Sequence, residues 1–124
     1  MSSNQLIKKQ SFRDLPFETR TSKLDRLLQT SPSKVPIIFE KHAKAKMSTE
    51  KPDIKFISDR NIKLGFFIEQ VRAILTLNEE DALYFSCGNS SVLSPDVVIG
   101  ELYEKHKEED GYLYIQFSEI SSFG

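Results

Sequence analysis

The sequence predicts one α+β domain, in which helices pack on a small mixed sheet. The chain has 124 residues, of which 39% are hydrophobic, and this length and composition favour a single modest core. Apolar residues recur at helical spacing in several stretches, most clearly in "LGFFIEQVRAILTL". Four short runs rich in β-branched and aromatic residues lie around these stretches, and such runs are typical of strands.

Two helical segments are expected near the N-terminus, a short one over residues 12–19 and a longer one over 22–30. In the longer segment three leucines recur at the spacing i, i+3, i+4. Ser22 and Asp25 form a capping-box pattern, so we expect this helix to begin there. Residues 1–10 are polar, and we expect them to form a flexible extension.

Two strands are expected next, in "KVPIIFEK" and "IKFIS". Pro36 lacks a backbone N–H, so it either places the first strand at a sheet edge or marks where that strand begins. In the second strand, Ile54, Phe56 and Ser58 share one side of the pleat. The segment between the strands, "KHAKAKMSTEKPD", is expected to be a basic loop.

The second half of the chain is expected to add a helix, a strand, a short helix and a final strand. The first of these helices carries a stripe of apolar residues: Leu64, Phe67, Ile68, Val71, Ile74 and Leu75. "ALYFSC" shows almost no polar alternation, which predicts a central, buried strand. In "SPDVVIGELYEKHK", Ser94 is expected to be the N-cap and Pro95 the first helical residue.

The final strand, "YLYIQFS", divides its side chains between two faces. Tyr112, Tyr114 and Gln116 are expected on one face, opposite Leu113, Ile115 and Phe117. A four-stranded mixed sheet around one long helix, with a free C-terminal strand, is the β-grasp arrangement of ubiquitin, and we take the strand order from that analogy. Two N-terminal helices are additional, so a helical subdomain is expected over 11–31, a ubiquitin-like domain over 32–118 and a tail over 119–124.

The net charge is only −1, but the charges are segregated along the chain. Residues 1–55 carry 12 Lys/Arg against 6 Asp/Glu, whereas residues 56–124 carry 5 against 12. Such asymmetry indicates two faces with different partners, or else serves only to keep the domain soluble. The sequence shows no signal peptide and no run long enough to cross a bilayer, and its single cysteine suits a reducing compartment.

No motif in the sequence predicts an enzyme, a metal site or a nucleic-acid interface. Cys87 has no histidine partner in the sequence pattern and is expected to be a buried structural thiol. His42 and His106 lack companions at metal-binding spacing. The acidic runs show no recognisable cleft, a glycine-rich phosphate loop is absent, and the basic half carries no nucleic-acid recognition motif.

Several stretches resemble the GABARAP-like family of autophagy ubiquitin-like modifiers. They are "PFETR", "VPIIFEKHAKAK", "EEDALYF", "GELYEKHKEEDGYLYIQFSE" and the terminal "FG", and the resemblance runs from about Phe12 to Gly124. It implies two N-terminal helices on a ubiquitin-like fold. It also implies conjugation of Gly124 to phosphatidylethanolamine, with no cofactor besides this covalent lipid, and docking of short receptor motifs.

The resemblance makes the carboxylate of Gly124 the reactive group. Activating and conjugating enzymes would pass it through thioesters to the lipid amine, and a deconjugating cysteine protease would release it. Glycine suits this chemistry because it lacks a Cβ that would obstruct the carbonyl. Since Gly124 is already the last residue, no prior cleavage is expected to be needed. The resemblance implies a cytoplasmic unconjugated form, and a lipidated form on autophagosomal and vacuolar or lysosomal membranes.

The resemblance also implies that the strand "IKFIS" pairs with an aromatic-x-x-aliphatic peptide. The aromatic pocket would be formed by Leu27, Pro36, Ile38, Lys55, Ile57 and Tyr112. The aliphatic pocket would be formed by Phe56, Ile62, Phe67 and Val71. Acidic residues beside the motif would meet Lys55 and the loop lysines Lys44, Lys46 and Lys51.

This sequence departs from the family pattern in three places near those pockets. Ser58-Asp59 stands where relatives usually have Val-Pro, so the second pocket is expected to be smaller or more polar. Gln70 replaces a residue that is often apolar, and Lys34 replaces an arginine. We therefore expect the general docking mode with a different ranking of peptides.

Two other functions fit parts of the sequence. One is an unconjugated peptide-docking adaptor in vesicle trafficking or cytoskeletal attachment, which would use the groove and not Gly124. The other is a sulfur carrier, which shares the β-grasp fold and a terminal glycine. Sulfur carriers usually end in paired glycines, whereas Phe123 precedes Gly124 here.

Overall fold

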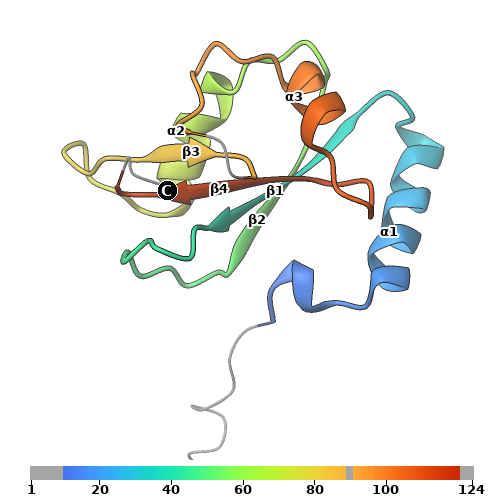
Figure 1. Cartoon of the computed structure of the whole chain (residues 1–124), viewed down its shortest axis with the longest axis horizontal. Coiled ribbons are helices and arrows are strands. Elements are labelled where there is room, and N and C mark those ends of the chain that lie inside the picture. The colour runs from blue at the N-terminus through green and yellow to red at the C-terminus, as the bar shows by residue number, and fades with distance from the viewer. Residues whose placement is uncertain (1–9, 89–90, 121–124) are drawn as a thin grey trace, which may run out of the picture.

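A computed structural model of the chain describes residues 10–88 and 91–120 (Figure 1). Its elements, in order, are a 3-10 turn η2 (Phe12–Asp14), α1 (Phe17–Thr30), β1 (Val35–Lys41), β2 (Asp53–Ser58), α2 (Gly65–Ile74), β3 (Tyr84–Ser86), α3 (Ile99–His106) and β4 (Leu113–Ser118). Within the described residues, no helix combines the length and apolar character that crossing a membrane requires.

The four strands form one mixed sheet in the order β2-β1-β4-β3. β1 pairs antiparallel with β2 and parallel with β4, and β3 pairs antiparallel with β4. The helices α2 and α3 cover one face of this sheet, and α1 with η2 lies against the other (Figure 1). The predicted four-stranded mixed sheet is therefore confirmed, and its two faces carry separate apolar clusters.

The larger cluster lies between the sheet and α2 and α3. Val35, Ile37 and Phe39 of β1 are completely buried in it. The Phe39 ring contacts those of Phe56, Phe67 and Phe85, at centroid distances of 5.8, 5.9 and 5.3 Å. Such aromatic pairs contribute beyond the area they bury, so this cluster is the main core of the domain.

The smaller cluster lies between the sheet and the N-terminal elements. Its buried members are Phe12, Leu24, Ile38, Tyr112 and Tyr114. The tyrosines of β4 thus face α1, whereas Leu113, Ile115 and Phe117 face the main core, as the alternation of the last strand predicted. The N-terminal helix is held by this second core rather than by its own propensity.

The N-terminal elements differ from the prediction in their boundaries. α1 begins at Phe17 after Pro16, so Ser22 and Asp25 lie inside the helix and the predicted capping box there is wrong. The short helix expected over 12–19 is only the three-residue turn η2. Leu15 is extended, as residues before proline tend to be, and this breaks the chain between η2 and α1.

Two strand predictions are corrected by the sheet order. β1 is an inner strand, so Pro36 marks the beginning of its strand and not a sheet edge. β3 was expected to be central, but it is a three-residue edge strand. Phe85 and Ser86 are nevertheless buried, since Phe85 packs in the main core, and Leu93 in the following loop donates a backbone hydrogen bond of 2.8 Å to Phe85 O.

The helix α3 begins later than the sequence pattern suggested. Val98 is its N-cap, whereas Ser94 lies in the preceding turn, where its hydroxyl accepts a hydrogen bond from Asp96 N–H. The first N–H groups of α3 donate to the loop after β2, from Ile99 to Ile62 O and from Gly100 to Arg60 O, both at 2.9 Å. A tertiary contact therefore sets the start of α3, in place of a local cap.

The helix α2 confirms the predicted apolar stripe over most of its length. Leu64, Phe67 and Val71 are buried, whereas Ile74 is 44% exposed. After the helix ends, Thr76 has a φ of 55°, in the left-handed region that is costly for a β-branched residue. Its N–H donates to Ala73 O, and the next N–H reaches back to Arg72 O, which closes the helix end.

Candidate functional site

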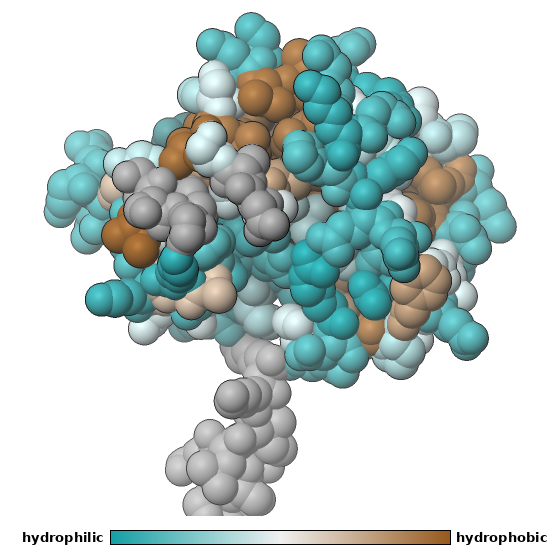
Figure 2. All heavy atoms as spheres, viewed as in Figure 1, coloured by the Kyte–Doolittle hydropathy of each residue, from teal (hydrophilic) through white to brown (hydrophobic). Residues whose placement is uncertain are grey.

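Strand β2 forms one edge of the sheet. Among residues 10–88 and 91–120, it pairs only with β1. The backbone N–H and C=O groups on its outer side are therefore where an extended peptide can add as a further strand. Most of the face shown in Figure 2 is hydrophilic, and its apolar side chains gather in separate patches. Ile57 of β2 is 41% exposed, which marks this edge as partly apolar.

The structure brings the six residues of the predicted aromatic pocket onto one face of the sheet. In the ladder, Pro36 lies opposite Ile57 and Ile38 lies opposite Lys55. Tyr112 and Leu27 belong to the same α1-facing cluster as Ile38. Lys55 and Ile57 are exposed, whereas Ile38 is completely buried and Tyr112 is only 1% exposed. The six residues thus form one patch, in which Lys55 and Ile57 on β2 are exposed and Ile38 and Tyr112 are buried.

The residues of the predicted aliphatic pocket lie on the opposite face. The Phe56 ring contacts the Phe67 ring, with centroids 5.1 Å apart. Phe67 and Val71 are core residues with 3% and 0% exposure, whereas Phe56 and Ile62 are only partly buried and pack on that core. An incoming side chain would therefore meet Phe56 and Ile62 first.

This placement on two faces matches the spacing of the expected motif. Successive side chains of a strand point to opposite faces, so residues i and i+3 of a peptide added to β2 also point to opposite faces. The aromatic residue of an aromatic-x-x-aliphatic peptide would then lie over Lys55 and Ile57. Its aliphatic residue would lie beside Phe56, on the α2 side.

Phe12 is a residue of this region that the sequence reasoning missed. Its ring packs edge-on against Tyr112, with centroids 4.7 Å apart, and the Lys55 amine lies 5.3 Å from its centroid. Its backbone N–H donates a 2.6 Å hydrogen bond to the Asp53 carboxylate at the start of β2. One local signal was available, because Ser11 and Asp14 form the capping box of η2.

Neighbouring groups shift the pKa of the Lys55 amine. Burial lowers the pKa of its amine, the positive charge of Lys23 lowers it further, and Asp53 opposes both effects. In the basic loop the backbone N–H of Lys46 donates to the Glu119 carboxylate at 2.9 Å, and Lys41 Nζ, at the end of β1, donates to Met47 O at 3.1 Å. The loop therefore packs in part against the base of the C-terminal tail.

The polar residues that depart from the family pattern make local hydrogen bonds and ion pairs. Ser58 is 3% exposed, and its hydroxyl donates a 2.8 Å hydrogen bond to Asp59 O. Asp59 pairs with Lys34, and the Gln70 amide donates to Phe66 O at 3.2 Å. Each of these polar groups thus has at least one hydrogen-bond or ion-pair partner, and the smaller or more polar second pocket stays a prediction.

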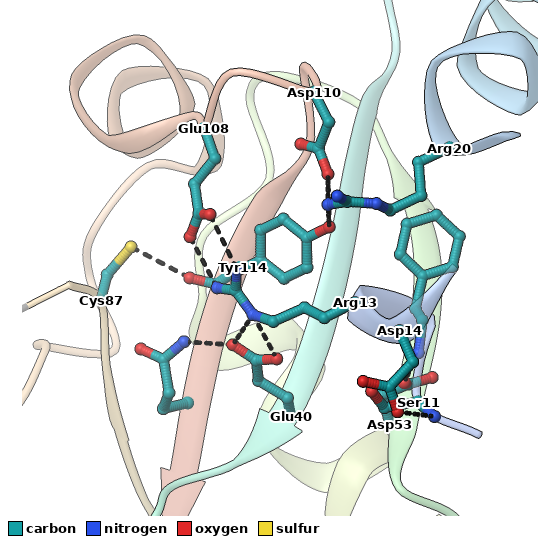
Figure 3. Close-up of polar contacts among 12 residues, drawn as sticks. Ser11, Arg13, Asp14, Arg20, Glu40, Asp53, Cys87, Glu108, Asp110 and Tyr114 are labelled. Atoms are coloured by element: carbon teal, nitrogen blue, oxygen red, sulfur yellow. Dashed lines mark hydrogen bonds and ion pairs between the residues drawn. The ribbon is translucent and has the colours of Figure 1, made fainter. Parts of the chain in front are cut away.

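A polar network fastens the N-terminal elements to the sheet (Figure 3). Arg13 lies between Glu40 and Glu108, with ion-pair distances of 2.9 and 2.6 Å. Arg20 of α1 pairs with the buried Asp110 at 2.6 Å, and the Tyr114 hydroxyl donates to the same carboxylate. The Arg13 guanidinium also stacks on the Tyr114 ring, 3.8 Å from its centroid.

The remaining candidate residues show no catalytic arrangement. Cys87 is 2% exposed, its thiol lies 3.2 Å from Tyr114 O, and burial raises its pKa to about 11, so it is a poor nucleophile. No group of three His, Cys, Asp or Glu residues within the described ranges is placed to hold a metal ion. Gly124 and most of the predicted tail lie outside the described residues, as do residues 1–9.

A family model described as autophagy protein Atg8, ubiquitin-like, matches residues 19–124. The chain belongs to the Atg8 family. The crystal structure of Trypanosoma brucei ATG8 is similar to it with a TM-score of 0.77 at 27% sequence identity, and the match covers 95% of this chain and 100% of that chain. The predicted family and the predicted ubiquitin-like fold are therefore confirmed.

Membership of the Atg8 family also sets the general role of the chain. Proteins of this family are ubiquitin-like modifiers of autophagy and not enzymes. They work with the enzymes of a ubiquitin-like cascade and with receptor partners.

Proposed function

We propose that this Atg8-family chain is a modifier that is conjugated through Gly124 to phosphatidylethanolamine and recruits cargo receptors through the edge of β2. The observation that carries the docking part is the placement of two largely apolar residue sets on opposite faces of the sheet beside β2, whose outer edge pairs with no strand in the described part of the chain. Family membership supports the conjugation part.

Conjugation would give the domain a membrane anchor. The carboxyl group of Gly124 is activated by an enzyme of the cascade, carried as a thioester, and attacked by the lipid amine to form an amide. Each buried CH₂ of an acyl chain contributes roughly 0.8 kcal/mol, so two chains hold the protein firmly on a membrane. The unconjugated form would then be cytoplasmic, and the lipidated form would lie on autophagosomal and vacuolar or lysosomal membranes.

Conjugation is tested by mass spectrometry of the intact protein. The chain is incubated with activating and conjugating enzymes, ATP and liposomes containing phosphatidylethanolamine, beside a matched chain that lacks Gly124. We expect a lipid adduct on the first chain alone. If enzymes that are active on a known relative give no adduct, the conjugation proposal is wrong, and the alternative of an unconjugated docking adaptor in trafficking or cytoskeletal attachment gains support.

Docking is tested by the spacing of the peptide. A fluorescent, acidic-flanked peptide with an aromatic-x-x-aliphatic motif is compared with one from which a single spacer residue is removed. Removal puts both anchors on the same face of the added strand, so binding should be lost. Equal binding of both peptides would refute pairing along β2.

The charge part of docking is tested separately by Lys55→Glu. This change should weaken binding of the acidic-flanked peptide, mainly through a slower association rate. Lys105→Glu changes the net charge equally on α3, away from β2, and should have little effect. If both variants bind like the unaltered chain, Lys55 has no role in recognising acidic flanks.

A further inference from the structure

Part of the predicted aromatic pocket is already buried in the free protein. Of its six residues, Ile38 is completely buried and Tyr112 is 1% exposed, so neither is open to a peptide side chain. The ring of Phe12 packs on Tyr112 and lies beside the Lys55 amine. Phe12 itself is 9% exposed. An aromatic ring of this chain therefore takes the space between two residues that an incoming ring is expected to contact.

The turn that carries Phe12 is separated from the following helix by an extended segment. Phe12 lies on η2, a turn of three residues, and the extended Leu15 and Pro16 separate this turn from α1 (Figure 1). Moving η2 outward therefore need not unwind α1. The contacts of Leu24 and Leu27 with the second core can stay in place while the Phe12 ring leaves.

Polar contacts at two places hold η2 against the sheet. One is the hydrogen bond from Phe12 N–H to Asp53, at the start of the docking strand itself. The other is the pairing of Arg13 with Glu40 and Glu108, in which the side chains of Arg13, Glu40 and Glu108 are 39%, 17% and 42% exposed and the guanidinium also stacks on the Tyr114 ring. These contacts add to the burial of the Phe12 ring in favouring the closed state, and a bound peptide must offset both.

We propose that Phe12 is the resident occupant of the aromatic pocket, and that a receptor peptide binds by displacing its ring. This inference rests on the proposed docking function. The affinity of a peptide is then reduced by the fraction of molecules in which the pocket is open. Burial of a phenylalanine side chain corresponds to roughly a tenfold to hundredfold preference for the closed state. Phe12 thereby sets the affinity of every peptide that uses this pocket.

The test compares Phe12→Ala with Phe17→Ala in a peptide titration. Phe17 is the matched control, because it is also an N-terminal phenylalanine but is 47% exposed at the start of α1. The probe is the fluorescent acidic-flanked peptide with an aromatic-x-x-aliphatic motif. We expect Phe12→Ala to bind it at least about tenfold more tightly than the unaltered chain, and Phe17→Ala to bind it equally well.

The two proposals fail in different ways. If the unaltered chain binds the peptide and Phe12→Ala binds it no better, docking stands and the displacement proposal is overturned. If the unaltered chain and both variants fail to bind, the docking function itself is overturned, and displacement with it.

A second measurement needs no substitution at Phe12. In the unaltered chain, nuclear Overhauser effects between the rings of Phe12 and Tyr112 report the closed state, in which the Phe12 ring packs on Tyr112 with the centroids 4.7 Å apart. Saturation with the peptide should abolish these contacts. Their persistence in the saturated complex would show that Phe12 is a fixed wall of the pocket, contrary to the proposal.

Discussion

Replacing Asp110 by asparagine should destabilise the domain strongly, because Asp110 is the buried centre of the junction between α1 and the sheet. Its side chain is 1% exposed and its carboxylate accepts hydrogen bonds from Arg20, the Tyr114 hydroxyl and Tyr112 N–H. Asp110→Asn keeps the shape of the side chain but leaves the Arg20 guanidinium without a counter-charge. Removing one partner of a buried ion pair typically costs about 3–5 kcal/mol.

The lower end of that range applies here. The Arg20 side chain is 16% exposed and also donates to Leu15 O, so part of its charge stays solvated and bonded. We therefore expect a loss of about 3 kcal/mol, which is a large fraction of the 5–15 kcal/mol that stabilises a typical domain. For a chain of this size the melting temperature should fall by roughly 10 °C.

The assay is urea unfolding followed by circular dichroism, with Glu108→Gln as the matched control. Glu108 also pairs with an arginine, but its side chain is 42% exposed, so its loss should cost about 1 kcal/mol or less. The reasoning predicts a clear separation between the two variants. If Asp110→Asn costs no more than Glu108→Gln, burial is not what gives the Asp110 pair its strength.

Three further predictions follow from particular residues. Thr76→Gly should raise the free energy of unfolding by about 1 kcal/mol in urea titrations, because glycine adopts the φ of 55° without strain, whereas Thr76→Ala should give no such gain. Burial raises the pKa of Tyr112 and Tyr114, so their contribution to stability should be constant below about pH 10 and be lost as the pH rises further. Tyr114→Phe should lessen that loss in unfolding midpoints measured from about pH 8 to 11. Cys87 should react with iodoacetamide at pH 8 far more slowly in the folded protein than in urea, because burial holds its pKa near 11; equal rates would contradict its burial.

The sequence predicted the strands and long helices well where a single periodic pattern decided them. The alternation of β4 placed Tyr112 and Tyr114 opposite Leu113 and Ile115, and the stripe of α2 placed Phe67 and Val71 in the core. These patterns are local, so they survive whatever the rest of the chain does.

The errors arose where a distant segment completes the local structure. β3 looked central because its residues are apolar, but it is an edge strand in which Phe85 is buried by the main core and accepts a backbone hydrogen bond from Leu93. The start of α3 is set by carbonyl groups of Arg60 and Ile62, which no capping pattern in its own sequence reveals. Phe12 escaped attention because nothing in the residues around it indicates that the ring reaches Tyr112.

The parallel pairing at the centre of the sheet ties folding to the progress of synthesis. β1 lies near the beginning of the chain and β4 near its end, yet Ile37 lies opposite Leu113 and Phe39 opposite Ile115. Contacts between residues so far apart in sequence form late and slowly, since a long loop must close first. A nascent chain therefore cannot assemble the middle of its sheet until the last strand has left the ribosome. Enzymes that recognise the folded domain thus meet only chains whose translation has passed β4.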